Sequence, residues 1–155
     1  MALSFVATRR SVLGGIFGAL MLPAAAFAGP EYFTGIVPGV AVGGYDPVAY
    51  FTDSKPVVGS KDITTTWKGV TWRFANEKNR DTFVAKPEAY APQYGGFCAF
   101  AVASGGTAKG DPKVWKVVDG KLYLNLDSGV QKLWERDISG NISKANKNWP
   151  RIVGQ

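Results

Sequence analysis

The stretch VWKVVDGKLYLN, residues 114–125, predicts a β-hairpin and with it the fold class of the chain. The first flank, VWKVV, consists mostly of β-branched and aromatic residues, as strands prefer, and the second, KLYLN, alternates polar or aromatic residues with leucine. The dipeptide Asp119-Gly120 between the flanks is among the strongest sequence signals for a two-residue hairpin turn. Asp127 or Ser128 can then cap a helix that extends to about Arg136. This part of the chain therefore predicts a hairpin followed by a helix.

The same order of elements occurs a second time, 51 residues earlier. Residues 63–67 and 70–74 are strand-like and flank the turn dipeptide Lys68-Gly69, and Asn76 can cap a helix that ends near Ala85. Four pairs of similar residues share this spacing: Gly69 and Gly120, Trp72 and Tyr123, Asn76 and Asp127, Phe83 and Trp134. The agreement indicates an internal repeat. The alternative is that a common local pattern matches by chance.

Short helices are predicted around these two units. Asp46 suits an N-cap and Pro47 the first helical position, so residues 46–51 predict a short helix. The uncharged, alanine-rich run 97–103 predicts a short buried helix. A polar helix is expected near 142–148, ended by Trp149-Pro150. The expected fold is a single small α+β domain: two β-hairpins, each followed by a helix, packed with short helices.

The first 28 residues resemble a bacterial export signal. A twin-arginine pair, Arg9 and Arg10, precedes an uncharged segment that ends in the small-x-small pattern of Ala26 and Ala28. The apolar run is shorter than the ~20 residues that span a bilayer, so cleavage and release to the periplasm are expected, with an uncleaved signal anchor as the alternative. Residues 29–44 are rich in Gly and Pro and are expected to wrap the surface irregularly. The domain proper is expected over residues 45–155, with no transmembrane segment.

Composition excludes several kinds of site. The chain has no His, its two Met residues lie in the signal, and Cys98 is its one Cys. These absences exclude a Ser-His-Asp or Cys-His catalytic site, a zinc cluster, His-ligated haem and an intramolecular disulfide. The net charge of +6 comes from scattered Lys and Arg residues without a basic run, so no nucleic-acid partner is expected.

Two groups of residues are candidates for a site. The Cys98 thiol follows a glycine pair, where the backbone can approach a ligand, and could bind a soft metal ion such as copper. Asp46, Tyr50, Tyr94 and Phe97 lie in or beside turns and could line a concave ligand pocket. For both groups the alternative is a purely structural role, because Cys and large aromatic residues are commonly buried.

Three segments resemble the YHS-domain family, and more closely its small exported bacterial branch. They are GYDPVAYF at 44–51, YGGFCA at 94–99, and GDP at 110–112 with WKVVDGKLYLN at 115–125. The resemblance covers nearly all of residues 42–150 and implies a small α+β domain. It also suggests metal handling, although the Tyr-His-Ser triplet is absent and Cys98 stands where metal-binding members carry several thiols.

The sequence supports a leading functional hypothesis and two alternatives. The first is an exported, non-catalytic binding module for a small ligand or protein partner, with weak metal binding through Cys98. The second is a redox or enzyme accessory in which Cys98 is a reactive thiol. The third is a structural or partner-binding domain in which Cys98 is buried and inert. Labelling of the native thiol separates the third hypothesis from the first two.

Overall fold

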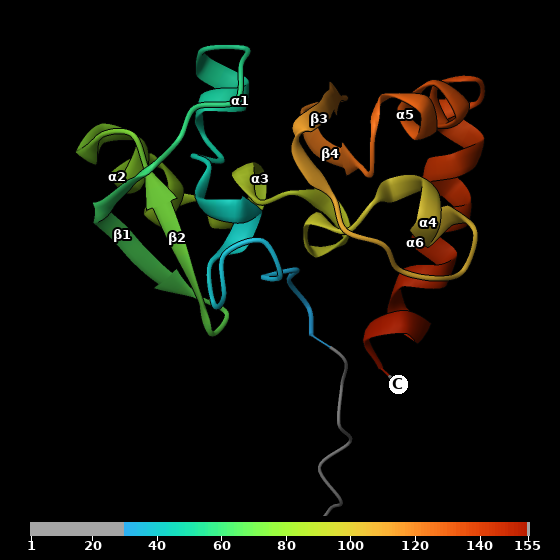
Figure 1. Ribbon diagram of the computed structural model, residues 1–155, viewed down its shortest axis with the longest axis horizontal. Coiled ribbons are helices and arrows are strands. Elements are labelled where there is room, and N and C mark those ends of the chain that lie inside the picture. Colours follow the sequence, from blue (N-terminus) through green and yellow to red (C-terminus); the bar gives the residue numbers. More distant parts are fainter. Residues whose placement is uncertain (1–29, 155) are drawn as a thin grey trace, which may run out of the picture.

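The computed structural model describes residues 30–154, in which two similar lobes lie side by side (Figure 1). The predicted export signal, with Arg9, Arg10, Ala26 and Ala28, lies outside these residues. Within the described part, no helix combines the length and the hydropathy that a membrane span requires.

Each lobe contains one antiparallel two-stranded sheet and a helix that follows it. In the first lobe, β1 (Ser60–Trp67) pairs with β2 (Val70–Phe74), and α2 (Glu77–Ala85) follows. In the second, β3 (Asp111–Val118) pairs with β4 (Lys121–Asn125), and α5 (Ser128–Glu135) and α6 (Ile138–Val153) follow. The predicted α+β class, with two hairpins each followed by a helix, is confirmed.

Short helical turns complete the fold. Three are α-helical: α1 (Ala49–Thr52), α3 (Pro87–Tyr90) and α4 (Ala99–Ala103). Two are 3-10 turns: η1 (Ala41–Gly44) and η2 (Gln93–Gly96). The stretch from α3 to η2 connects the two lobes (Figure 1).

Both hairpin turns have the backbone that their sequences predict. Lys68 and Gly69 have φ values of 50° and 75°, and Asp119 and Gly120 have values of 50° and 71°. Positive φ at both central residues is the mark of a type I′ turn, whose twist matches that of the strands.

The internal repeat is confirmed by the element boundaries. β1 and β3, β2 and β4, and α2 and α5 each begin 51 residues apart. Both hairpins carry a register shift at the same place, between Ser60 and Thr64 in the first and between Asp111 and Trp115 in the second. Each following helix is capped by the residue predicted for it, because the side chains of Asn76 and Asp127 accept from the backbone N–H three residues ahead.

The likeness extends to the turns before the hairpins. In η1 and η2, Val42-Gly43-Gly44 and Tyr94-Gly95-Gly96 all have positive φ. Two residues after each of these turns, a backbone N–H binds the segment that leads into the hairpin. The Asp46 N–H donates to the Val57 carbonyl at 2.8 Å, and the Cys98 N–H donates to the Ala108 carbonyl at 2.9 Å. Asp46 and Cys98 therefore occupy equivalent positions in the two repeats.

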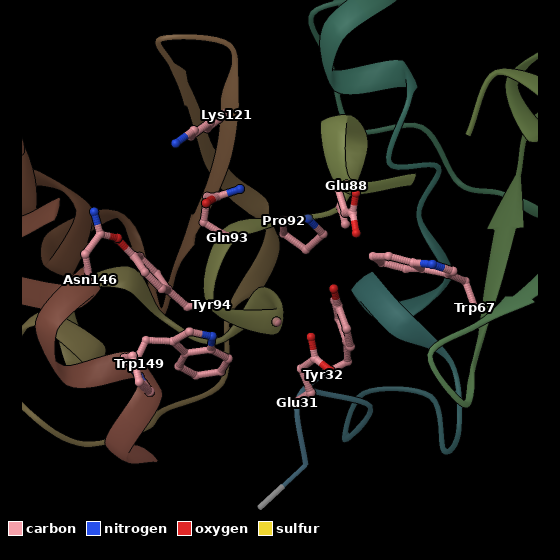
Figure 2. Close-up of a pocket in the computed structure, with 13 residues that line it drawn as sticks. Glu31, Tyr32, Trp67, Glu88, Pro92, Gln93, Tyr94, Lys121, Asn146 and Trp149 are labelled. Atoms are coloured by element: carbon pink, nitrogen blue, oxygen red, sulfur yellow. The ribbon is translucent and has the colours of Figure 1, made fainter. Parts of the chain in front are cut away.

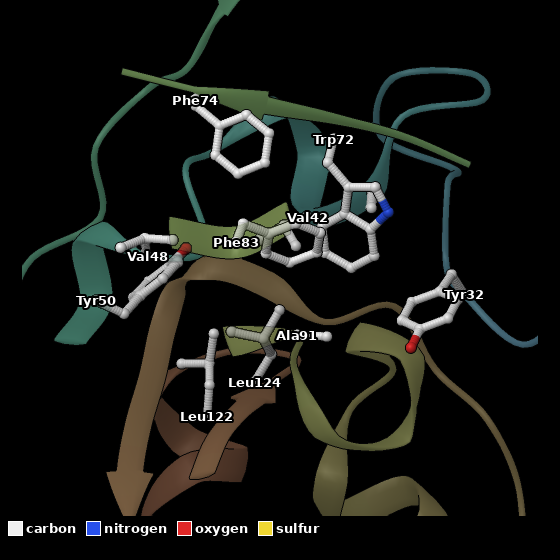
Figure 3. Close-up of a cluster of buried hydrophobic side chains, with 11 residues drawn as sticks. Tyr32, Val42, Val48, Tyr50, Trp72, Phe74, Phe83, Ala91, Leu122 and Leu124 are labelled. Carbon is white, nitrogen blue, oxygen red and sulfur yellow. The ribbon is translucent and has the colours of Figure 1, made fainter. Parts of the chain in front are cut away.

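Two hydrophobic cores lie on opposite faces of β4. Leu122 and Leu124 pack in the first core, which is formed mainly by the first lobe and contains Trp72 and Phe83 (Figure 3). Tyr123, between the two leucines, packs in the second core against Trp134, with ring centroids 5.4 Å apart. Alternating side chains of a strand point to opposite faces, so one strand contributes to both cores.

The segment before residue 45 contributes to the folded unit. Tyr32 and residues 40–42 are buried, and Tyr32 packs on Trp72 with ring centroids 5.2 Å apart. These large apolar side chains explain why a Gly- and Pro-rich segment lies against the core and does not simply follow the surface.

The C-terminal helix α6 differs from the sequence prediction. It begins at Ile138 and continues through Trp149-Pro150 to Val153, where a stop was expected. Pro150 is exposed, and its ring requires a φ that a helix also uses, so the cost is one missing backbone hydrogen bond and local crowding. Trp149 and Ile152 on either side of it pack against the second core, and this burial favours the continued helix.

Candidate ligand-binding cleft

Asp46 is a fully buried carboxylate whose hydrogen bonds are satisfied within the first lobe. Oδ1 accepts from the N–H groups of Val48 at 2.8 Å and Ala49 at 3.3 Å. Oδ2 accepts from the Ala75 N–H at 2.8 Å and from Asn79 Nδ2 at 2.7 Å. The side chain thus caps α1 and ties it to the start of α2, and its oxygens are not directed at a cavity.

Tyr50 is also buried, and it joins the first lobe to the second. It is 1% exposed, its hydroxyl donates to the carbonyl of Pro112 at 2.7 Å, and its ring packs on Trp115. Burial is the main reason that the pKa of its hydroxyl is raised, with the nearby Tyr45, Asp111 and Asp46 adding to the effect. Tyr50 therefore fastens α1 to the start of β3.

Cys98 lies between η2 and α4 in the second lobe and is 1% exposed. The Sγ atom lies 3.6 Å from Asn125 Oδ1, which also accepts from the Phe100 N–H at 3.2 Å. An amide oxygen is a hard ligand, whereas copper in its reduced form selects thiolate and thioether ligands. Among residues 30–154 no group of three His, Cys, Asp or Glu side chains could hold a metal ion. The surroundings of Cys98 do not fit a copper site.

Tyr94 and Phe97 lie together in the second lobe, apart from Asp46 and Tyr50. The Tyr94 hydroxyl donates to Asn146 Oδ1 at 2.8 Å, and both rings pack on Trp149, with centroid distances of 5.9 and 6.0 Å. Of the four predicted ligand residues, Tyr94 alone lines the cleft described next. The structure does not bring the four together.

A cleft of about 400 Å³ lies between the two lobes (Figure 2). One wall comes from the first lobe and the segment before it, and is lined by Glu31, Tyr32, Trp67, Glu88 and Ala91. The other comes from η2, β4 and α6, and is lined by Pro92, Gln93, Tyr94, Gly95, Lys121, Asn146, Trp149 and Pro150. The walls therefore combine aromatic rings with charged and amide groups.

The first wall is acidic and aromatic. The Tyr32 hydroxyl and the carboxylates of Glu31 and Glu88 point toward the same space beside the Trp67 ring (Figure 2). Burial raises the pKa of the Tyr32 hydroxyl, and the negative charges of Glu31 and Glu88 raise it further, so it stays protonated at neutral pH. Within residues 30–154, no Lys or Arg is within ion-pairing distance of Glu88.

A close backbone approach holds Glu31 and Tyr32 at this place. The Phe33 N–H donates to the Gly95 carbonyl at 2.8 Å. Gly95 has a φ of 59°, and a Cβ there would overlap the Glu31 carbonyl oxygen. Gly95 therefore allows the segment carrying the first wall to lie directly on η2 of the second wall.

Sequence reasoning missed most of this cleft. Trp67 packs against the first core and also lines the cleft, and its strand pattern indicates only the first of these roles. Glu31, Glu88 and Asn146 carry no motif, and single residues of these types are mostly found on the solvated surface. The one available signal was Tyr94 beside two glycines, because a non-glycine residue at a φ of 55° marks a backbone with a special requirement.

The chain was compared with models of protein families, with curated protein sequences and with solved structures, and none of these gave a match.

Proposed function

We propose that this chain is an exported, non-catalytic module that binds a small ligand in the cleft between its two repeats. The observation that carries the proposal is the convergence of Tyr32, Trp67, Tyr94 and Trp149 with polar groups around one concavity. Small-molecule sites are typically clefts of about 300–1,000 Å³ with apolar and aromatic walls and a few polar groups that fix orientation. The 400 Å³ cleft fits that description.

The surroundings of Cys98 support placing the site in the cleft. A thiol that reacts with other thiols or binds metal needs access and an environment that favours the thiolate. Cys98 is enclosed, and the polar atom that its Sγ contacts is the neutral amide oxygen of Asn125. This favours an inert structural role for Cys98 over weak metal binding or redox chemistry, and leaves the resemblance to YHS domains as a prediction.

The five tryptophans provide a direct test. Trp67 and Trp149 line opposite walls of the cleft, whereas Trp115 packs on Tyr50 and does not line it. A fragment library is screened by NMR on protein labelled at its indole nitrogens. Binding in the cleft should shift the indole N–H signals of Trp67 and Trp149 and leave that of Trp115 in place. If hits shift Trp115 alone, or if no fragment shifts Trp67 or Trp149, the cleft is not the binding site.

A further inference from the structure

The acidic wall of the cleft has a particular chemistry, and this inference about it rests on the function proposed above. We propose that the cleft binds an organic ammonium group between Glu88, Tyr32 and Trp67, and that Lys68 competes for the same wall from outside by holding Glu31. The ligand class is an amine or a methylated ammonium, and the competing group belongs to the chain itself.

The first step is the pairing of negative charge with an aromatic face. An ammonium is attracted to the electron-rich face of an indole and to carboxylates, and the aromatic contribution is about 0.5–2 kcal/mol. Glu88 has no ion-pair partner among the described residues, and the buried ring of Tyr32 stands beside Trp67 with centroids 5.7 Å apart. Glu88 is exposed and therefore hydrated, so its charge does not require a partner, but an ammonium beside it gains an ion pair that a neutral ligand cannot form.

The second step is that Glu31 and Trp67, which belong to the same wall, already bind the ammonium group of Lys68. Lys68 Nζ lies 2.6 Å from Glu31 Oε1 and 4.9 Å from the centroid of the Trp67 ring. Lys68 is not among the residues that line the cleft, whereas Glu31 and Trp67 are. The lysine therefore neutralises one of the two carboxylates and leaves the other available.

The third step concerns direction. Lys121 stands on the opposite wall, with Gln93 and Asn146 (Figure 2). A cation is repelled from that wall and attracted to Glu88, so the ammonium end of a ligand enters toward α3. Aromatic faces favour a weakly hydrated ammonium over a metal ion that keeps its water shell.

The test compares two cations with neutral molecules of similar size. Tetramethylammonium and n-butylammonium are titrated into the full-length chain alongside neopentyl alcohol and n-butanol, with the indole signals of Trp67 and Trp149 as the readout. Both cations should bind at least about threefold more tightly than their neutral counterparts. Raising the salt concentration should weaken cation binding and leave alcohol binding unchanged.

Two variants test the roles of Glu88 and Lys68. Glu88→Gln should weaken cation binding about three- to tenfold, and Lys68→Met should strengthen it about threefold by releasing Glu31. The second lobe offers a matched control, because Lys116 and Glu135 form an exposed ion pair at 2.8 Å that does not line the cleft. Glu135→Gln and Lys116→Met should leave binding unchanged.

The outcomes separate this inference from the proposed function. If the alcohols bind as tightly as the cations, or if Glu88→Gln has no effect, the ammonium site is wrong while the cleft remains a binding site. If Ca²⁺ binds and displaces the ammonium probes, the acidic wall is a metal site and the inference fails. If Lys68→Met weakens or does not change cation binding, the competing role of Lys68 is wrong. If no probe shifts Trp67 or Trp149, both proposals fail.

Discussion

Asp46 makes the strongest stability prediction, because one buried carboxylate accepts four hydrogen bonds. Asp46→Ala removes the cap of α1, which costs about 1–2 kcal/mol. It also leaves the Asn79 amide and the partly exposed Ala75 N–H without their acceptor, which adds about 2–3 kcal/mol. We expect a total loss of about 4 kcal/mol in the free energy of unfolding. Typical domain stabilities are about 5–15 kcal/mol, so the variant should be close to its folding limit.

The control is a cap of the simpler kind in the second repeat. Asp127 is exposed, and its side chain accepts one hydrogen bond, from the Val130 N–H at 2.8 Å. Asp127→Ala should therefore cost about 1 kcal/mol. Asp46→Asn keeps the shape but turns an amide N–H₂ toward two donors, and it should fall between the two alanine variants.

Urea unfolding followed by tryptophan fluorescence measures all three variants, with m-values compared to confirm that the unfolded state is unchanged. If Asp46→Ala and Asp127→Ala agree within 1 kcal/mol, Asp46 is only a helix cap and its bonds to Ala75 and Asn79 contribute nothing measurable.

Four further predictions address the turns, the last helix, the thiol and export. Gly120→Val should lower the free energy of unfolding by about 1–2 kcal/mol, because valine is strained at a φ of 71°, and an unchanged urea midpoint would contradict this. Pro150→Ala should raise the free energy of unfolding by about 1–3 kcal/mol by restoring a helix hydrogen bond, and a lower melting temperature would show that the proline ring itself is needed. Cys98 should react with a thiol reagent in native protein only at the rate of unfolding, so rapid labelling without denaturant would refute its enclosed position. Replacing both Arg9 and Arg10 with Lys should abolish accumulation in the periplasm, and full accumulation would mean that the twin-arginine assignment is wrong.

The fold could be predicted largely because its signals are local. Asp119-Gly120 is a strong local signal for a type I′ turn, and Gly69 supplies a residue that adopts positive φ readily in the other turn. Asn76 and Asp127 cap their helices through bonds to residues three positions ahead. The end of α6 could not be predicted in this way. A proline is a local signal to stop, whereas the packing of Trp149 and Ile152 that overrides it depends on the tertiary structure.

The cleft was less accessible to sequence reasoning because its residues come from distant parts of the chain. Glu31 reaches the wall that also carries Glu88 because residues 31–33 lie against η2, and that contact depends on a glycine at position 95. Asp46 and Tyr94 were grouped because both lie in or beside turns, each close to a pair of glycines. Their surroundings in the sequence are similar because the repeat places one such Gly-Gly turn in each lobe. The two residues therefore lie in different lobes, although their sequence contexts are alike.

Strand β4 has a consequence for how the protein unfolds. Leu122 and Leu124 complete the core of one repeat and Tyr123 that of the other, so neither half encloses its own hydrophobic residues without the other. A slip of one residue along β3 would exchange the two faces and disrupt both cores at once. Because β4 is shared in this way, the two repeats should unfold as a single cooperative unit. Fragments divided near residue 107 should accordingly be unfolded alone and regain structure only when mixed.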